Sequence, residues 1–195
     1  GFAPQSSFNR LLVAPRTIRP QLLEKIDREI ANKKSGKHAF IRLKLNSLLD
    51  EEFVEALYRA SIEGVEVDLV IRGICALLPG IPGVSENIRV RSVLGRFLEH
   101  SRIFHFANGG DDEIYIGSAD LMERNLNRRV ESLVRITRKE HKDSLVKIFD
   151  SYIASTTAGW HLLPNGKWQK VDADPAGNKL QDLQAVMIDS YRKSL

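Results

Sequence analysis

The fold is decided by residues 38–73, which read HAFIRLKLNSLLDEEFVEALYRASIEGVEVDLVIRG. In the first part, 38–46, apolar and basic residues alternate, which is typical of a half-buried strand with one wetted side. Asp50 can then cap a helix, and Gly64 marks the end of that helix. The apolar run at 65–73 indicates a second strand. Two strands separated by a helix predict a crossover between parallel neighbours, and therefore an α/β fold.

The segments on either side extend this pattern. Residues 9–15 form a short apolar run closed by proline, and apolar residues at helical spacing predict a helix between Pro20 and Gly36. An irregular loop rich in proline and glycine, 76–87, follows the strand at 65–73, at the end where open α/β sheets tend to bind ligands. These units together predict a mixed, largely parallel sheet flanked by helices.

The rest of the chain supplies further strands and an accessory C-terminal part. The remaining elements are expected in this order: strands at 88–94, 102–107, 113–118 and 130–136, a helix at 145–152, a hairpin at 160–171 and a helix at 179–195. We expect one domain covering 1–195, with an α/β core at 1–156 and a small C-terminal hairpin and helix at 157–195.

The composition suits a globular domain and excludes several other classes. Of the 195 residues, 43% are hydrophobic and 28% are charged, which argues against a disordered or fibrous chain. The single cysteine, Cys75, cannot form an internal disulfide or a thiolate cluster. No apolar stretch approaches the roughly 20 residues that cross a bilayer, and no secretion signal is evident, so we expect a soluble, cytoplasmic protein. The first methionine is Met122, so we also expect a fragment of a longer chain.

A formal net charge of +4 favours anionic partners, and two strand ends carry residues suited to phosphate. Arg72 and Gly73 end one strand, where the guanidinium can present a charged fork and the glycine can let a ligand approach the backbone. The ordinary alternative is a surface ion pair. His100 and Arg102 are expected on the same side of another strand, so that they could address one anion together.

His100 is the candidate catalytic residue. An imidazole can act as nucleophile, acid or base towards a phosphoryl group near neutral pH, while an arginine stabilises the negative charge on its oxygens. The ordinary alternative is a surface or hydrogen-bonded histidine, which is the interpretation of the four others, His38, His105, His141 and His161.

Two further features are candidates for anion binding. Ser118 lies between Gly117 and Ala119 where a strand ends, so that backbone amides and its hydroxyl could cradle an oxyanion. The alternative is a helix start capped by Ser118 or Asp120. A possible track for a polyanion, or simply a solvated face, is formed by Arg89, Arg91, Arg124 and Arg128.

Two long motifs resemble the C-terminal domain of bacterial polyphosphate kinase, an enzyme that reversibly moves the terminal phosphate of ATP onto polyphosphate. They are LKLNSLLDEEFVEALYRASIEGVEVDLVIRGICALLPGIPGVSENIRVRSVLGRFLEHSRIFHFANGG at 43–110 and YIGSADLMERNLNRRVE at 115–131. By this resemblance Arg72 and His100 match positions that contact ATP phosphates, and His100 is the second essential histidine. The histidine that becomes phosphorylated would lie in an upstream domain.

The resemblance also implies partners and cofactors. ATP, ADP and polyphosphate are the expected substrates, with Mg²⁺ required by the full enzyme through residues outside this chain. The upstream domains of the same polypeptide are expected partners, the full enzyme is expected to be a homo-oligomer, and its peripheral association with a membrane is left open. No metal site and no specific nucleic-acid partner are expected here.

The pattern also looks like a degenerate phospholipase D signature, which predicts a phospholipase-D-like fold. Arg102 stands where that signature has lysine, Ala107 stands near its aspartate, and the spacing to Gly117 and Ser118 is longer. These departures count against hydrolysis by two histidines. The alternatives that stay open are half of a phospholipase-D-like phosphodiesterase or nuclease, and a basic nucleic-acid-binding module.

Overall fold

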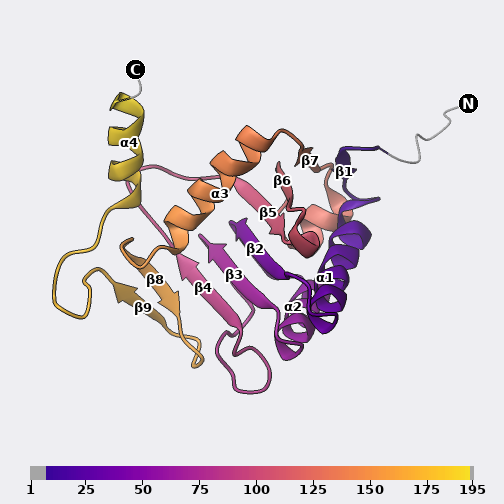
Figure 1. Cartoon of the computed structure of the whole chain (residues 1–195), viewed down its shortest axis with the longest axis horizontal. Coiled ribbons are helices and arrows are strands. Elements are labelled where there is room, and N and C mark those ends of the chain that lie inside the picture. Colours follow the sequence, from indigo (N-terminus) through magenta and orange to yellow (C-terminus); the bar gives the residue numbers. More distant parts are fainter. Residues whose placement is uncertain (1–7, 194–195) are drawn as a thin grey trace, which may run out of the picture.

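The computed structural model describes residues 8–193, which form one nine-stranded sheet with helices on both faces (Figure 1). The strands are β1 (Leu11–Val13), β2 (Phe40–Leu45), β3 (Glu66–Ile71), β4 (Ile88–Ser92), β5 (Arg102–Phe106), β6 (Glu113–Gly117), β7 (Ser132–Ile136), β8 (Gly159–Leu162) and β9 (Trp168–Val171). The helices are α1 (Ile18–Lys34), α2 (Glu51–Ile62), α3 (Lys139–Ile153) and α4 (Leu183–Lys193), with single turns η1 (Asn108–Gly110) and η2 (Arg124–Arg128).

The sheet is mixed, as expected, but it is parallel only at its centre. The strand order is β1-β7-β6-β5-β2-β3-β4-β8-β9, and only the β2–β3 and β3–β4 pairs are parallel. The prediction of a largely parallel sheet therefore fails outside the three central strands. The physical reason is that short hairpin connections, such as the turn between β5 and β6, can join only antiparallel neighbours.

The two faces of the sheet are covered by different helices. Helices α1 and α2 pack on one face, where alternate side chains of β2 and β3 enter the main core, and α3 crosses the other face (Figure 1). On that second face Val70 packs with Phe149 and Tyr152 of α3 and with Leu183 of α4. Burying each such large apolar side chain stabilises the fold by about 1.5–3 kcal/mol.

Asp50 occupies the N-cap position of α2, but its carboxylate makes no capping hydrogen bond. Instead it accepts two hydrogen bonds from Arg19 of α1, at 2.8 and 2.6 Å. The expected helix start is therefore correct in position, while the side chain joins α1 to α2. Within residues 8–193, no helix combines the length and the apolar character needed to cross a membrane.

The C-terminal part joins the main sheet rather than standing apart from it. Strand β8 pairs with β4, and the predicted Asn165-Gly166 turn links β8 to β9, with Gly166 at a φ of +78°. The terminal helix, expected at 179–195, begins at Leu183. Its last two expected residues, 194 and 195, lie outside the described residues.

The register of the central strands brings several chain segments to one edge of the sheet. Leu45 at the end of β2 pairs with Ile71 at the end of β3, and Lys44 pairs with Ile103 near the start of β5. Arg102 at that start pairs in turn with Gly117 at the end of β6. The residues that directly follow β2, β3 and β6 therefore meet those that precede β5.

Candidate functional site

Arg72 lies at this edge and is held by a neighbouring strand end. Its Nε donates to Oδ1 of Asn46, which follows β2, at 2.7 Å. Among residues 8–193, the two terminal nitrogens of Arg72 have no hydrogen-bond or carboxylate partner. The surface ion pair considered as the alternative is therefore absent from the part of the chain that the structure describes. The half-buried guanidinium keeps its fork available for an anion.

The role expected of Gly73 is different in the structure. A Cβ added at this position would come within 2.9 Å of the Asn46 carbonyl oxygen. The space beside the glycine is thus filled by the backbone after β2 rather than left open for a ligand. Gly73 lets the ends of β2 and β3 approach each other, which places Asn46 within reach of Arg72.

His100 and Arg102 are in contact, but they do not project side by side from a strand. His100 is exposed and precedes β5, whereas Arg102 begins β5 and is only 7% exposed. Nη1 of Arg102 donates to the His100 carbonyl oxygen at 2.8 Å and lies 3.0 Å from Nδ1 of the ring. Nη2 of Arg102 also lies 3.5 Å from Nε2 of the ring, so the imidazole lies against the guanidinium. Because a guanidinium can only donate, Nδ1 accepts in the shorter contact.

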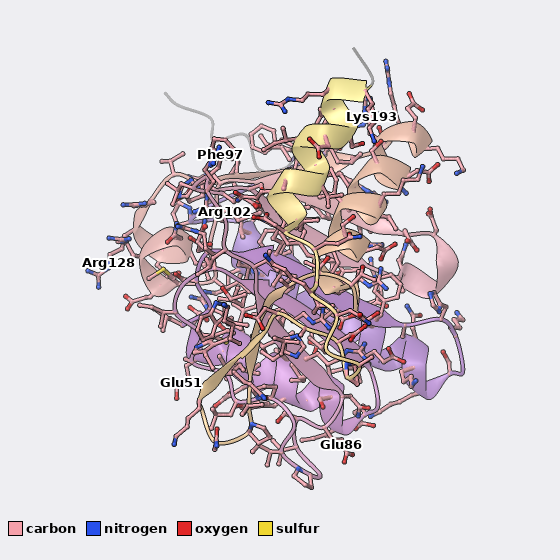
Figure 2. The ribbon with its side chains drawn as sticks, turned by 90° about the vertical axis from the view of Figure 1, so that its left-hand side faces the viewer. Glu51, Glu86, Phe97, Arg102, Arg128 and Lys193 are labelled. Carbon is pink, nitrogen blue, oxygen red and sulfur yellow. The ribbon has the colours of Figure 1, made fainter. Side chains whose placement is uncertain are left out.

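Arg102 is taken up by Asp120, a residue that the sequence suggested only as a helix cap. Its Nη2 and Nε donate to the two carboxylate oxygens of Asp120 at 2.8 and 3.2 Å. Both side chains are 8% exposed, so removing either partner would leave an uncompensated buried charge at a cost of about 3–5 kcal/mol. The expectation that Arg102 binds phosphate directly does not fit this geometry, because its donors already face Asp120 and His100. Figure 2 shows Arg102 within the body of the molecule.

Ser118 is neither a cradle nor a cap in this structure. Its hydroxyl oxygen accepts from the backbone N–H of Ser132 at 3.2 Å, and its own N–H donates to the Ser132 carbonyl at 3.0 Å. The exposed Ser118 thus extends the pairing between β6 and β7. The next helical element is the single turn at Arg124–Arg128, whose N-cap position is Glu123.

The four arginines expected as a track fall into two separate groups. Arg89 on β4 pairs with Asp68 at 2.7 Å, and Arg91 donates to the Ala154 carbonyl at 2.9 Å. Arg124 and Arg128 lie on the turn after β6, with Arg128 projecting at the edge of the molecule (Figure 2). Strands β5, β2 and β3 lie between the two groups, so they form no continuous row.

The loop that carries His100 is held by side chains that the sequence did not single out. Lys44 is 5% exposed, and its Nζ lies 3.2 Å from a Glu99 carboxylate oxygen and 2.9 Å from the Ser101 hydroxyl. Burial lowers the pKa of Lys44, and the charge of Glu99 opposes that shift. Tyr152 of α3 also donates to Glu99.

Helix α4 supports the same loop through Gln184. The Gln184 side chain accepts from the Phe97 N–H at 2.8 Å and donates to the Phe97 carbonyl at 2.9 Å. Its amide also donates to Glu99 at 2.9 Å. A Cβ at Gly95 would come within 2.4 Å of Gln184, so the loop passes close against this side chain.

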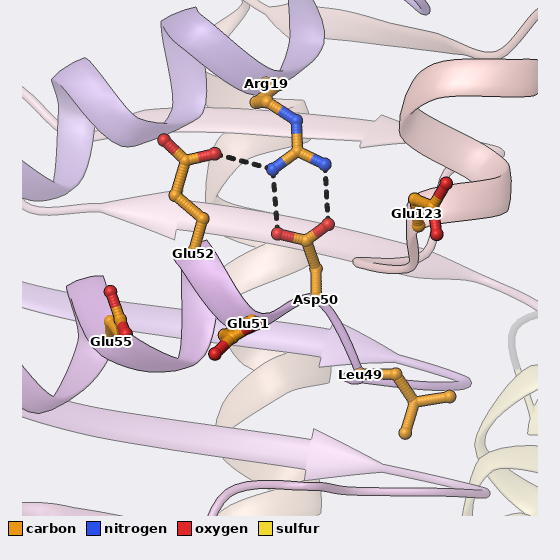
Figure 3. A pocket seen from close by; sticks show the side chains of 7 residues that line it. All are labelled: Arg19, Leu49, Asp50, Glu51, Glu52, Glu55 and Glu123. Atoms are coloured by element: carbon orange, nitrogen blue, oxygen red, sulfur yellow. Dashed lines mark hydrogen bonds and ion pairs between the residues drawn. The ribbon is translucent and has the colours of Figure 1, made fainter.

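A pocket of about 490 Å³ lies near the same sheet edge, but its lining is acidic. Figure 3 shows Arg19 between Asp50 and Glu52, with Glu51, Glu55 and Glu123 around it. Because Arg19 is already bound to two carboxylates, this pocket repels phosphate.

Metal and thiol chemistry find no support in residues 8–193. No group of three or more histidine, cysteine or acidic side chains in that part of the chain could hold a metal ion. Burial raises the pKa of the Cys75 thiol to about 11, so the thiol is protonated near neutral pH.

Comparison with known proteins gives consistent matches over nearly the whole chain. Residues 11–182 match the sequence family described as polyphosphate kinase C-terminal domain 2. A polyphosphate kinase from Streptomyces coelicolor is 50% identical over 193 residues, which are 99% of this chain and 26% of that protein. One from Mycobacterium avium is 46% identical over 192 residues, covering 98% of this chain and 26% of that protein. The chain therefore spans about a quarter of the length of these relatives.

Solved structures agree with these matches. A polyphosphate kinase from Porphyromonas gingivalis superposes with a TM-score of 0.89 at 34% identity, covering 97% of this chain and 29% of that one. The phospholipase D family member Nuc from Salmonella typhimurium gives a TM-score of 0.55 at 16% identity, covering 83% of this chain and 96% of that one. This second likeness shows the fold alone, and it confirms the expected phospholipase-D-like architecture.

Proposed function

Because this chain belongs to the polyphosphate kinase family, we propose that it supplies, within a longer polypeptide, half of a site for phosphoryl transfer between ATP and polyphosphate. Arg72 and His100 are its contacts to the travelling phosphate. The other half, with the histidine that becomes phosphorylated, is contributed by upstream domains.

The observation that carries this proposal is the arrangement at the shared strand edge. Arg72 presents two donor nitrogens that no residue within 8–193 occupies, and it is linked through Asn46 and Asp120 to Arg102 and so to His100. The guanidinium of Arg72 and the imidazole of His100 thus belong to one hydrogen-bonded network. Such a pair is suited to hold a phosphoryl group while it is transferred between two partners.

The chemistry divides between charge neutralisation and positioning. In the first step the terminal phosphoryl group of ATP would bond to a nitrogen of the upstream histidine as its bond to the ADP oxygen breaks, and ADP would leave. In the second step the phosphorus–nitrogen bond would break as the phosphoryl group bonds to a terminal oxygen of the polyphosphate chain. The fork of Arg72 would neutralise charge on the phosphate oxygens. A ring N–H of His100 would donate to an oxygen of the same group and steady it during transfer.

Magnesium is expected for the complete enzyme, with its ligands expected outside this chain. Within residues 8–193, no group of three or more histidine, cysteine or acidic side chains could hold a metal ion. We therefore assign no step of this proposal to the ion.

Arg72→Lys in the complete enzyme is expected to raise the KM for ATP about tenfold, because an ammonium group cannot reproduce the fork or keep the Nε bond to Asn46. The KM and kcat are measured by ATP-dependent polyphosphate synthesis. The matched control is Arg59→Lys, at an exposed arginine paired with Asp27 on the helical side of the molecule. Unchanged kinetics in Arg72→Lys would remove Arg72 from the nucleotide site.

The 195-residue chain by itself is expected to show no polyphosphate synthesis, because the site requires a histidine from another part of the polypeptide. The measurement is incorporation of phosphate from radiolabelled ATP into acid-insoluble polymer, with the complete enzyme at equal concentration as the positive control. Full turnover by the chain alone would contradict the half-site.

A further inference from the structure

Asp120 enters the proposal above only as a link between Arg72 and His100, yet its carboxylate oxygens accept four hydrogen bonds. It follows β6 in the buried segment after Ser118 and is 6% exposed. Besides Arg102, its Oδ1 accepts from the backbone N–H groups of Asn46 at 2.7 Å and Ser47 at 3.2 Å. One carboxylate thus ties the end of β6 to the start of β5 and to the chain after β2.

The arm from Asp120 towards His100 runs through Arg102. Nε and Nη2 of the guanidinium donate to Asp120. Its Nη1 donates to the carbonyl oxygen of His100 and contacts Nδ1 of the ring. Because Asp120 fixes the plane of the guanidinium, it also fixes the direction from which the imidazole is held.

The arm from Asp120 towards Arg72 runs through Asn46. With its backbone N–H held by Asp120, Asn46 uses Oδ1 to accept from Nε of Arg72 at 2.7 Å. Asn46 is 6% exposed, and its Nδ2 has no hydrogen-bond partner among residues 8–193. Leaving a buried donor without a hydrogen bond lowers the stability of the fold. Asn46 nevertheless keeps its oxygen towards Arg72, as expected of a side chain that positions the guanidinium.

We propose that Asp120 is a positioning residue that sets His100 and Arg72 relative to each other, through Arg102 on one side and Asn46 on the other. This inference rests on the proposed function, in which the imidazole and the guanidinium meet the same phosphate. Phosphoryl transfer depends on such placement, and a displacement of about 1 Å can lower the rate about 100-fold. The strand ladders alone do not orient either side chain.

The test uses the complete enzyme and three variants that divide the network. Asp120→Asn presents an amide donor to Arg102 and removes the charge from the oxygen that accepts from the Asn46 N–H, so it disturbs both arms. Asn46→Leu is close in size, removes the unpaired amide and cuts only the Arg72 arm. Arg102→Lys keeps a positive charge beside Asp120 but cannot also contact His100, so it cuts only the other arm. The control is Asp143→Asn, an exposed carboxylate paired with Lys139 on α3.

The expected result is a division of kinetic effects. Asn46→Leu raises the KM for ATP about tenfold, the size of one lost hydrogen bond to a charged group, with kcat unchanged. Arg102→Lys lowers kcat about 100-fold and shifts its pH profile, with KM unchanged. Asp120→Asn does both, and adding Asn46→Leu to it raises KM no further, because the two act through one path.

Other outcomes have definite meanings. Independent, multiplying effects of Asp120→Asn and Asn46→Leu on KM would overturn the inference, as would normal kinetics in Asp120→Asn beside impaired His100→Ala and Arg72→Lys. Normal kinetics in all of these variants would instead overturn the proposed function itself. If circular dichroism shows that Asp120→Asn does not fold, Asn46→Leu and Arg102→Lys still test the inference. The network would be refuted if each of these two variants changed KM and kcat together.

Discussion

His100→Ala in the complete enzyme is expected to lower ATP-dependent polyphosphate synthesis about 1,000-fold while leaving the fold intact. The imidazole is exposed at the sheet edge, so its removal creates no cavity in the core. Its loss takes away the imidazole that contacts Arg102 and the donor that would face the travelling phosphate. Acid–base groups positioned in this way contribute about 100- to 10,000-fold to enzymatic rates.

The measurement is the initial rate of synthesis, alongside circular dichroism and a denaturant midpoint for folding. The control is His141→Ala, which removes another exposed histidine, on α3 and away from the network. We expect its rate to equal that of the unmodified enzyme. Retained synthesis in His100→Ala would make this histidine a bystander, whatever happens at Arg72.

Gly117→Ala is expected to reduce the free energy of unfolding of this chain by about 3 kcal/mol, the upper range for overpacking a tight site. A Cβ on Gly117 would stand 2.0 Å from the Ser132 carbonyl oxygen and 2.7 Å from the Leu133 side chain. The oxygen belongs to the backbone of β7 and cannot rotate away, so β6 and β7 must separate locally. Urea unfolding, followed by tryptophan fluorescence, measures the loss.

Gly73→Ala provides a graded comparison, because its nearest contact would be 2.9 Å from the Asn46 carbonyl oxygen. We expect a smaller loss of stability there, of about 1 kcal/mol. Equal stability of Gly117→Ala and the unmodified chain would mean that the β6–β7 edge yields more readily than its pairing indicates. The sequence suggests Gly117 as part of an anion cradle, whereas the structure gives Gly117 a packing role between β6 and β7.

The elements were largely predictable from the sequence, whereas the strand directions were less so. The strand–helix–strand unit around α2 is local, and its alternation and helix boundaries are written in adjacent residues. The antiparallel placement of β5, β6 and β7 beside β2 depends on which strands become neighbours, and no short-range pattern encodes that. The prediction of parallel pairing holds for β2–β3 and β3–β4, whereas β1, which a helix also follows, pairs antiparallel with β7.

The candidate site divides in a similar way. Arg72 and His100 are candidates from the sequence because arginine and histidine at strand ends are chemically conspicuous, and their role stays a prediction. Asp120 and Asn46 were not identifiable, because they are 74 positions apart and only the β2–β5–β6 register brings them together. Arg102 stands out in the sequence, but nothing local pairs it with Asp120. Without that carboxylate, an arginine at a strand end is easily interpreted as a phosphate ligand. An acidic residue among the small residues after β6 was the available signal.

The contact between Gln184 and the Phe97 backbone has a consequence for biosynthesis. A ribosome makes the loop at 95–100 long before it makes α4, so the nascent chain can pair its central strands while this loop still lacks its side-chain clamp. A message cut short ahead of the codon for Gln184 would therefore yield a folded sheet whose loop at 95–100 lacks the Gln184 contacts. The order of translation thus delays the maturation of this edge until helix α4 has emerged.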